Sequence, residues 1–132
     1  NKGRTVNFNN TIIFLTSNLK DPTTYFRPEM IGRFSDVVKF NPLSMEVMPL
    51  LVNKELKGLN KKLAKQNLKL ELTKELADYL SKEGHSVDYG ARPMIRLFNN
   101  KVSKPLAQQI LAGSLKEGVV SVDIKNGEVV FK

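Results

Sequence analysis

Apolar and polar positions divide the chain into a short strand-forming start and a longer α-rich remainder. Residues 11–16 form a continuous apolar and β-branched run that ends at Ser17 and Asn18, as expected of a strand buried on both faces of a parallel sheet. Residues 36–40 are a candidate for a second short strand. Because one apolar strand alone has neither edge partners nor covering helices, we expect the rest of this sheet to come from sequence outside the chain.

Helical and strand periodicities alternate in the middle of the chain. Apolar side chains recur at helical spacing over residues 47–63, and Ser44 stands where an N-cap is expected. Residues 68–72 alternate between leucine and polar side chains, which predicts a short half-buried strand. Thr73 then caps a second helix that ends at Gly84, since glycine tolerates the left-handed conformation that terminates helices.

The last forty or so residues predict helices followed by a small sheet. Pro93 suits the first position of a helix, because its fixed φ angle is already helical. Pro105 predicts a kink or a new helix, which runs on to a stop at Gly113. Two apolar strands then flank Asn126-Gly127, a strong hairpin signal. The predicted fold class is therefore α+β.

Composition places the chain among globular proteins of one domain or two small subdomains. Its 132 residues are 41% apolar and 26% charged. No cysteine occurs and His85 is the only histidine, so we expect no disulfide and no metal site, and a surface role for His85. No apolar run approaches the roughly 18 residues that span a bilayer. We therefore expect a cytoplasmic protein without a membrane partner.

A net charge of +8 raises the question of acidic partners. Lys54, Lys57, Lys61 and Lys65 recur at helical spacing and predict one lysine stripe. A solvated helix face is the simplest interpretation, and an acidic docking partner is the alternative. A nucleic-acid-binding module is the competing function, but the stripe lacks the interleaved aromatic side chains that stack on single strands. An oligomerisation domain is a third hypothesis.

Several short motifs occur in a fixed order along the chain: NTIIFLTSN (residues 10–18), FRPEMIGR (26–33), GARPM (90–94), KPLA (104–107) and GSL (113–115). Together they resemble successive signatures of the second ATPase module of Clp/Hsp100 AAA+ protein-unfolding ATPases. Each motif alone is a weak signal, but three longer ones in order form a strong one, because chance matches multiply.

The resemblance implies a division of the chain and a function for the protein that contains it. Residues 1–41 would be the C-terminal remnant of an AAA+ α/β large subdomain, and residues 42–132 a small helical subdomain with a small terminal β-sheet. The implied function is a hexameric ring that couples ATP hydrolysis to subdomain motion and threads unfolded proteins. ATP and Mg²⁺ would serve the parent protein. The chain itself has neither the phosphate-binding loop nor the paired acids for Mg²⁺, so we expect it to bind no nucleotide tightly and to hydrolyse none alone.

In the first subdomain the resemblance assigns two catalytic residues. Asn18 matches sensor 1, which holds the attacking water near the γ-phosphate; an amide both donates to phosphate and accepts from water. Arg33 matches the arginine finger that reaches the nucleotide of a neighbouring subunit, an effect worth roughly 10³ to 10⁵ in rate. The structural alternatives are that Asn18 merely ends a strand and that Arg33 pairs with Glu29 on a helix. Arg27 is a weaker candidate for the finger.

In the second subdomain Arg92 matches sensor 2, which contacts the nucleotide of its own subunit. Gly90 and Pro93 frame it as they do in the family. An arginine fixed in direction by a proline-started helix can convert phosphate contact into rotation of the whole subdomain. The alternative is a capping or packing arginine, for which Arg96 would serve equally well.

The chain departs from the family at two places. Only residues 19–25 separate the first motif from the second, where relatives carry a longer stretch, and this stretch includes a peptidase-docking loop in peptidase-coupled members. Either this relative has lost the stretch, or the sequence omits it. Phe34 and Ser35 follow Arg33 where many relatives place an Asp two residues after the arginine. The GARPM and GSL motifs favour a ClpA-like protein, with a ClpP-type serine peptidase as its partner. ClpB-like disaggregases and ClpC-like proteins remain the alternatives.

Overall fold

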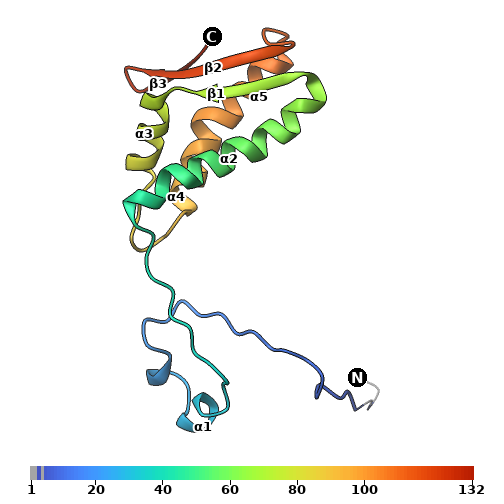
Figure 1. Ribbon diagram of the computed structural model, residues 1–132, viewed down its shortest axis with the longest axis vertical. Coiled ribbons are helices and arrows are strands. Elements are labelled where there is room, and N and C mark those ends of the chain that lie inside the picture. Colours follow the sequence, from blue (N-terminus) through green and yellow to red (C-terminus); the bar gives the residue numbers. More distant parts are fainter. Residues whose placement is uncertain (1–2, 4) are drawn as a thin grey trace. The chain divides into compact units, whose positions relative to one another are not determined.

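The computed structural model describes residue 3 and residues 5–132. The chain divides into two compact units, Asn1–Lys39 and Phe40–Lys132 (Figure 1). Among the described residues the first unit contains only two short helical elements, whereas the second contains a sheet and longer helices.

The first unit is built around the 3₁₀ turn η1 (Pro22–Thr24) and the one-turn helix α1 (Pro28–Ile31). Asp21 begins η1 and accepts hydrogen bonds from the backbone N–H (2.9 Å) and the hydroxyl (2.6 Å) of Thr23. These bonds stabilise the carboxylate and lower the pKa of Asp21. Helix α1 begins at a proline, as favoured at a helix start, and ends at Gly32.

The strands predicted for residues 11–16 and 36–40 are not formed, and that part of the prediction is wrong for this chain. Ile12 and Phe14 are 83% and 85% exposed, and Phe40 is 89% exposed. A strand needs a neighbouring backbone for its ladder of hydrogen bonds. None of the described residues of the first unit supplies one, so the apolar run lies on the surface without regular structure.

The second unit is α+β, which confirms the predicted fold class. Its elements are η2 (Met45–Val47), α2 (Met48–Leu63), η3 (Ala64–Gln66), β1 (Leu68–Leu72), α3 (Lys74–Glu83), α4 (Arg92–Phe98), the π-helical turn η4 (Asn99–Ser103), α5 (Lys104–Leu111), β2 (Gly118–Lys125) and β3 (Glu128–Phe131). The strands lie in the order β1-β2-β3, with β1 parallel and β3 antiparallel to β2. Figure 1 shows the helices gathered on one face of this sheet.

One hydrophobic core joins the sheet to the helices. Its fully buried side chains come from α2, α3, α4, η4, α5 and the inner faces of β1 and β2; the largest are Phe98, Met48, Leu70, Leu76, Leu80, Met94 and Leu106. Alternate residues of β1 are buried and exposed, as the leucine pattern predicts. Burial of this kind is the main stabilising term for such a domain.

The free edge of β1 is covered by a side chain of α2. The Asn60 amide donates to the Leu70 carbonyl (2.9 Å), and its oxygen accepts the Leu70 N–H (2.7 Å). A side-chain amide has one donor group and one acceptor, so it can replace a neighbouring strand at one residue. This contact satisfies backbone groups of a residue that is 1% exposed.

Most predicted helix boundaries are confirmed, with two corrections of detail. Ser44 precedes the 3₁₀ turn η2 and makes no side-chain cap hydrogen bond, so α2 begins only at Met48, with Pro49 in its first turn. Gly84 ends α3 as predicted, but with φ of −86° and not in the left-handed region. A Cβ at Gly84 would lie 2.5 Å from the Met94 Cβ, so glycine is required there by packing.

The C-terminal half follows the predicted order of elements. The π-helical turn η4 joins α4 to α5, and Pro105 occupies the first turn of α5, which resolves the choice between a kink and a new helix. Gly113 ends α5 with φ of +73°. Asn126 and Gly127 both have positive φ (52° and 80°), the signature of a type I′ hairpin turn, which confirms the hairpin.

Candidate functional site

Arg92 begins α4 and projects from a well-anchored helix. Gly90, with φ of +60°, turns the chain just before it, and Pro93 follows it in the first turn. Met94 and Phe98 fix α4 in the core, at 0% and 1% exposure. The Arg92 side chain itself is exposed. Its guanidinium makes no hydrogen bond or salt bridge with another described residue, so the structure gives no support to a capping role.

The loop between α3 and α4, residues 84–91, contacts the start of the second unit. Nε2 of His85 lies 3.0 Å from the carbonyl oxygen of Leu43. The Leu43 side chain lies next to Gly90, since a Cβ built there would be 3.9 Å from Leu43 Cδ1. The Arg92 N–H donates to the Tyr89 carbonyl over 3.4 Å. The loop thus connects the segment after Pro42 with the first turn of α4.

Asn18 and Arg33 both lie on the surface of the first unit. Asn18 follows the apolar run that forms no strand, and Arg33 follows α1, with its N–H donating to the Met30 carbonyl (3.1 Å). The alternative ion pair with Glu29 is not formed among the described residues. Because Arg92 belongs to the other unit, convergence of the three residues on one nucleotide stays a prediction.

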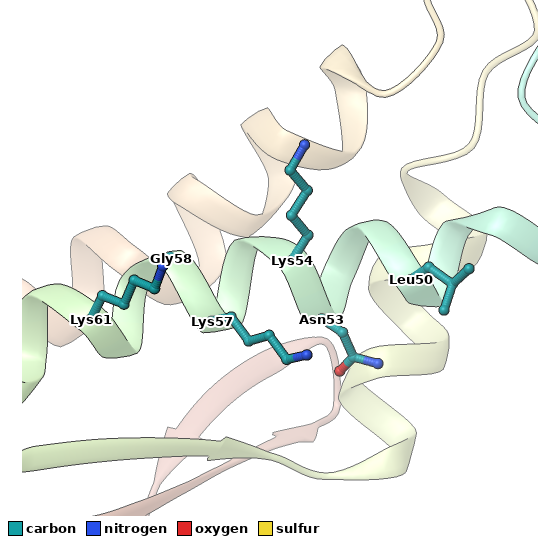
Figure 2. Close-up of a pocket in the computed structure, with 6 residues that line it drawn as sticks. All are labelled: Leu50, Asn53, Lys54, Lys57, Gly58 and Lys61. Carbon is teal, nitrogen blue, oxygen red and sulfur yellow. The ribbon is translucent and has the colours of Figure 1, made fainter.

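A lysine-lined groove runs along the outer face of α2 (Figure 2). Its lining residues are Leu50, Asn53, Lys54, Lys57, Gly58 and Lys61, which recur every three to four positions on one helix face. The lysines are exposed, and none of them forms a salt bridge within the described part of the chain. The groove contains three of the four lysines of the predicted stripe, whereas Lys65 lies beyond α2 in η3 and does not line it; no aromatic side chain lines the groove.

Two further findings on the described residues concern metal ions and membranes. No group of three or more histidine, cysteine, aspartate or glutamate side chains is placed to bind a metal ion. Within residue 3 and residues 5–132, no helix combines the length and the apolar character needed to cross a membrane. The His85 imidazole is used in the contact with Leu43.

Comparison with protein families identifies the class to which this fold belongs. The model of the C-terminal, D2-small domain of ClpB protein matches residues 43–123, from the start of the second unit into β2. The match confirms the resemblance to Clp/Hsp100 AAA+ proteins. The chain belongs to the family of the C-terminal, D2-small domain of ClpB.

Curated relatives of the chain are named chaperone protein ClpB, in agreement with the family match. The chain is 35% identical to chaperone protein ClpB of Aquifex aeolicus over 98% of its own length and 16% of the relative. It is 35% identical to that of Staphylococcus epidermidis (99% and 18%) and 37% identical to that of Corynebacterium glutamicum (96% and 16%). The chain therefore spans less than a fifth of the length of these relatives. Their names favour the ClpB alternative and give no support to a ClpA-like subtype or a ClpP-type partner.

Sequence reasoning did not find the contact between His85 and Leu43. The two residues lie 42 positions apart, and neither belongs to a motif with a recognisable spacing. A single histidine between Gly84 and Ser86 gives no signal of its partner. Only the packing of α3 against α4 brings the imidazole to the segment that follows Pro42.

Proposed function

We propose that the chain is the sensor-bearing end of the second ATPase module of a ClpB-type chaperone. In the full-length protein it would couple ATP hydrolysis to movement of the small subdomain, within a homo-oligomeric ring that acts on unfolded proteins. The observation that carries this proposal is the setting of Arg92. It combines an exposed guanidinium, a helix anchored in the core and a glycine-proline frame, within a domain of the ClpB D2-small family.

The three candidate residues have distinct roles in this proposal. Asn18 orients the attacking water, and Arg33 neutralises charge on the nucleotide of the neighbouring subunit. Arg92 binds phosphate oxygens of the nucleotide in its own subunit and so ties α4 to the nucleotide state. ATP with Mg²⁺ supplies the phosphoryl group whose transfer to water drives the cycle. The exposed guanidiniums fit this ligand, because neither forms a salt bridge with another described residue.

The ClpB subtype is the better proposal because the relatives of the chain are named ClpB. A chaperone that releases its substrate needs no peptidase partner. We therefore propose a disaggregase-type protein in place of the protease subunit first favoured by the GARPM and GSL motifs.

The test compares two arginines of the same helix in the full-length protein. Arg92→Ala should uncouple nucleotide from small-subdomain movement, because the phosphate contact is lost. Arg96→Ala, one turn further along α4 and equally exposed, should leave the movement intact. A pair of fluorescent labels on the two subdomains measures their separation with and without ATP. A normal ATP response in the Arg92→Ala protein would remove Arg92 from its proposed role.

A further inference from the structure

The second unit begins with a segment that is pinned to the loop between α3 and α4. Nε2 of His85 lies 3.0 Å from the Leu43 carbonyl oxygen, and both residues are half-buried. A carbonyl only accepts hydrogen bonds, so this contact requires a proton on Nε2. The bond fixes the backbone of Leu43 to the end of α3.

The Leu43 side chain lies beside the same loop. A Cβ built at Gly90 would be 3.9 Å from Leu43 Cδ1, and the positive φ of +60° at Gly90 turns the loop toward α4. Pro42 stands immediately before Leu43; a proline fixes its own φ at about −65° and disfavours helical backbone at the preceding residue, Asn41. The carbonyl and the side chain of Leu43 therefore both lie against the loop between α3 and α4.

The loop is in turn fixed to α4. Gly84 lies so close to Met94 that a Cβ at Gly84 would stand 2.5 Å from the Met94 Cβ and 2.6 Å from its Cα. Met94 is fully buried and lies two residues after Arg92. A continuous series of contacts thus runs from Arg92 through the first turn of α4 to Gly84, His85 and Leu43.

We propose that His85 is a positioning residue that confines the hinge between the two units to the residues before Leu43. This inference rests on the proposed function. The boundary between the units falls between Lys39 and Phe40, and residues 40–42 connect it to Leu43, so rotation of the rest of the second unit changes dihedral angles over these residues. With Leu43 clamped to α4, movement of Arg92 is transmitted to that short hinge. Without the clamp, residues 43 and 44 join the hinge and absorb part of the movement.

The first test uses the chain itself. His85 is its only histidine, so the imidazole ¹⁵N resonances in an NMR spectrum need no assignment. With the imidazole neutral, we expect the proton on Nε2 and a bare Nδ1. The opposite tautomer would overturn the proposal, because a bare Nε2 cannot donate to the Leu43 carbonyl.

The second test uses the full-length protein with labels on the two subdomains. His85→Leu removes the donor, whereas His85→Gln keeps an N–H at a similar reach. We expect the His85→Leu protein to lose part of the ATP-dependent change in label separation, because residues 43 and 44 then absorb some of the movement, and the His85→Gln protein to stay near wild type. A His85→Gln protein as impaired as His85→Leu would overturn the hydrogen bond as the cause.

An Arg92→Ala protein, measured alongside, separates this proposal from the proposed function. If Arg92→Ala abolishes the ATP response while His85→Leu leaves it unchanged, the clamp is refuted and the function of Arg92 stands. If neither substitution changes the response, the result refutes the proposed function, and with it the clamp that rests on that function. A merely structural role of His85 would lower the melting temperature of the His85→Leu protein without altering its response to ATP, and that result would also refute the clamp.

Discussion

At the scale of single residues, two glycines of the second unit lie in similar helical backbone for different reasons. Gly58 stands in the middle of α2, and a Cβ built there would meet no atom within 4 Å. Gly84 stands at the end of α3, where a Cβ would lie 2.5 Å from the Met94 Cβ and 2.6 Å from the Leu80 carbonyl oxygen. Only a hydrogen fits at Gly84, while Gly58 merely weakens its helix.

Alanine at these two glycines should have opposite effects on stability. Gly84→Ala forces α3 and α4 apart and should lower the free energy of unfolding by about 1–3 kcal/mol, as overpacked sites do. Gly58→Ala should raise it by up to about 1 kcal/mol, because alanine favours the helix and restricts the unfolded chain. Urea denaturation of the two variants, followed by circular dichroism, gives both values. Equal effects of the two substitutions would contradict the packing argument.

The sequence predicts the position of Gly84 but not its cause. A glycine after an apolar-periodic segment is a local signal for a helix end, and α3 does end there. The close approach of Met94 depends on how α4 returns against α3, which no local pattern contains. The same holds for His85, whose partner Leu43 is distant in sequence.

At the scale of elements, Thr73 and Asp123 join α3 to the sheet. The Thr73 N–H donates to the Val122 carbonyl (2.9 Å), and its hydroxyl accepts the Leu76 N–H (3.4 Å) and donates to the Asp123 carboxylate (3.1 Å). The Asp123 carboxylate also accepts a hydrogen bond from the Ile124 N–H (2.8 Å), and this bond contributes most to lowering its pKa. These donors favour the charged carboxylate, and they lower the pKa of Asp123 below its ordinary value.

Stability should therefore depend on acid through Asp123. Its pKa is lower in the folded than in the unfolded chain, where it is about 3.9. The carboxylate thus contributes stability at neutral pH, and this contribution is lost as the pH falls below about 4 through the lowered folded value. We expect Asp123→Asn to be less stable than wild type at neutral pH, with the difference shrinking in acid. Denaturation measured across this pH range gives the difference in stability between the Asp123→Asn protein and wild type, with the exposed Asp78→Asn protein as control. A difference that stayed constant as the pH fell would contradict the role of Asp123.

Elements that depend on local signals are predicted well, and those that depend on partners are not. The Thr73 cap, the leucine alternation of β1 and the Asn126-Gly127 turn each specify their structure within a few residues. Residues 11–16 carry an equally strong strand pattern and form no strand, because a strand is completed only by another backbone. The π-helical turn η4 has no sequence signal of its own, and Pro105 predicts only a break near it.

At the scale of the whole molecule, the candidate site is divided between two units. Asn18 and Arg33 belong to Asn1–Lys39, and Arg92 belongs to Phe40–Lys132. Family resemblance, and not the fold of this chain, predicts that they meet at a nucleotide. Exposure of Ile12, Ile13, Phe14 and Leu15 fits this hypothesis, because large apolar side chains in a row are normally covered by other protein.

The role of Arg33 can be tested only in the assembled protein, because an arginine finger acts on the nucleotide of a neighbour. Arg33→Ala should leave ATP binding nearly unchanged and lower hydrolysis by about a thousandfold or more, as loss of such fingers does. Arg27→Ala, at the N-cap of α1 and also exposed, should retain most of the activity.

Mixed assemblies of Asn18→Ala and Arg33→Ala subunits distinguish action across the interface from a defect within the subunit. If Arg33 acts on its neighbour, a subunit that keeps Asn18 regains hydrolysis when the adjacent subunit supplies Arg33, so the mixture hydrolyses ATP although neither variant does so alone. If Arg33 acts within its own subunit, no site contains both residues and the mixture stays inactive. That result would exclude Arg33 as a finger that acts on a neighbour, and full activity of the Arg33→Ala assembly with an inactive Arg27→Ala assembly would transfer the role to Arg27.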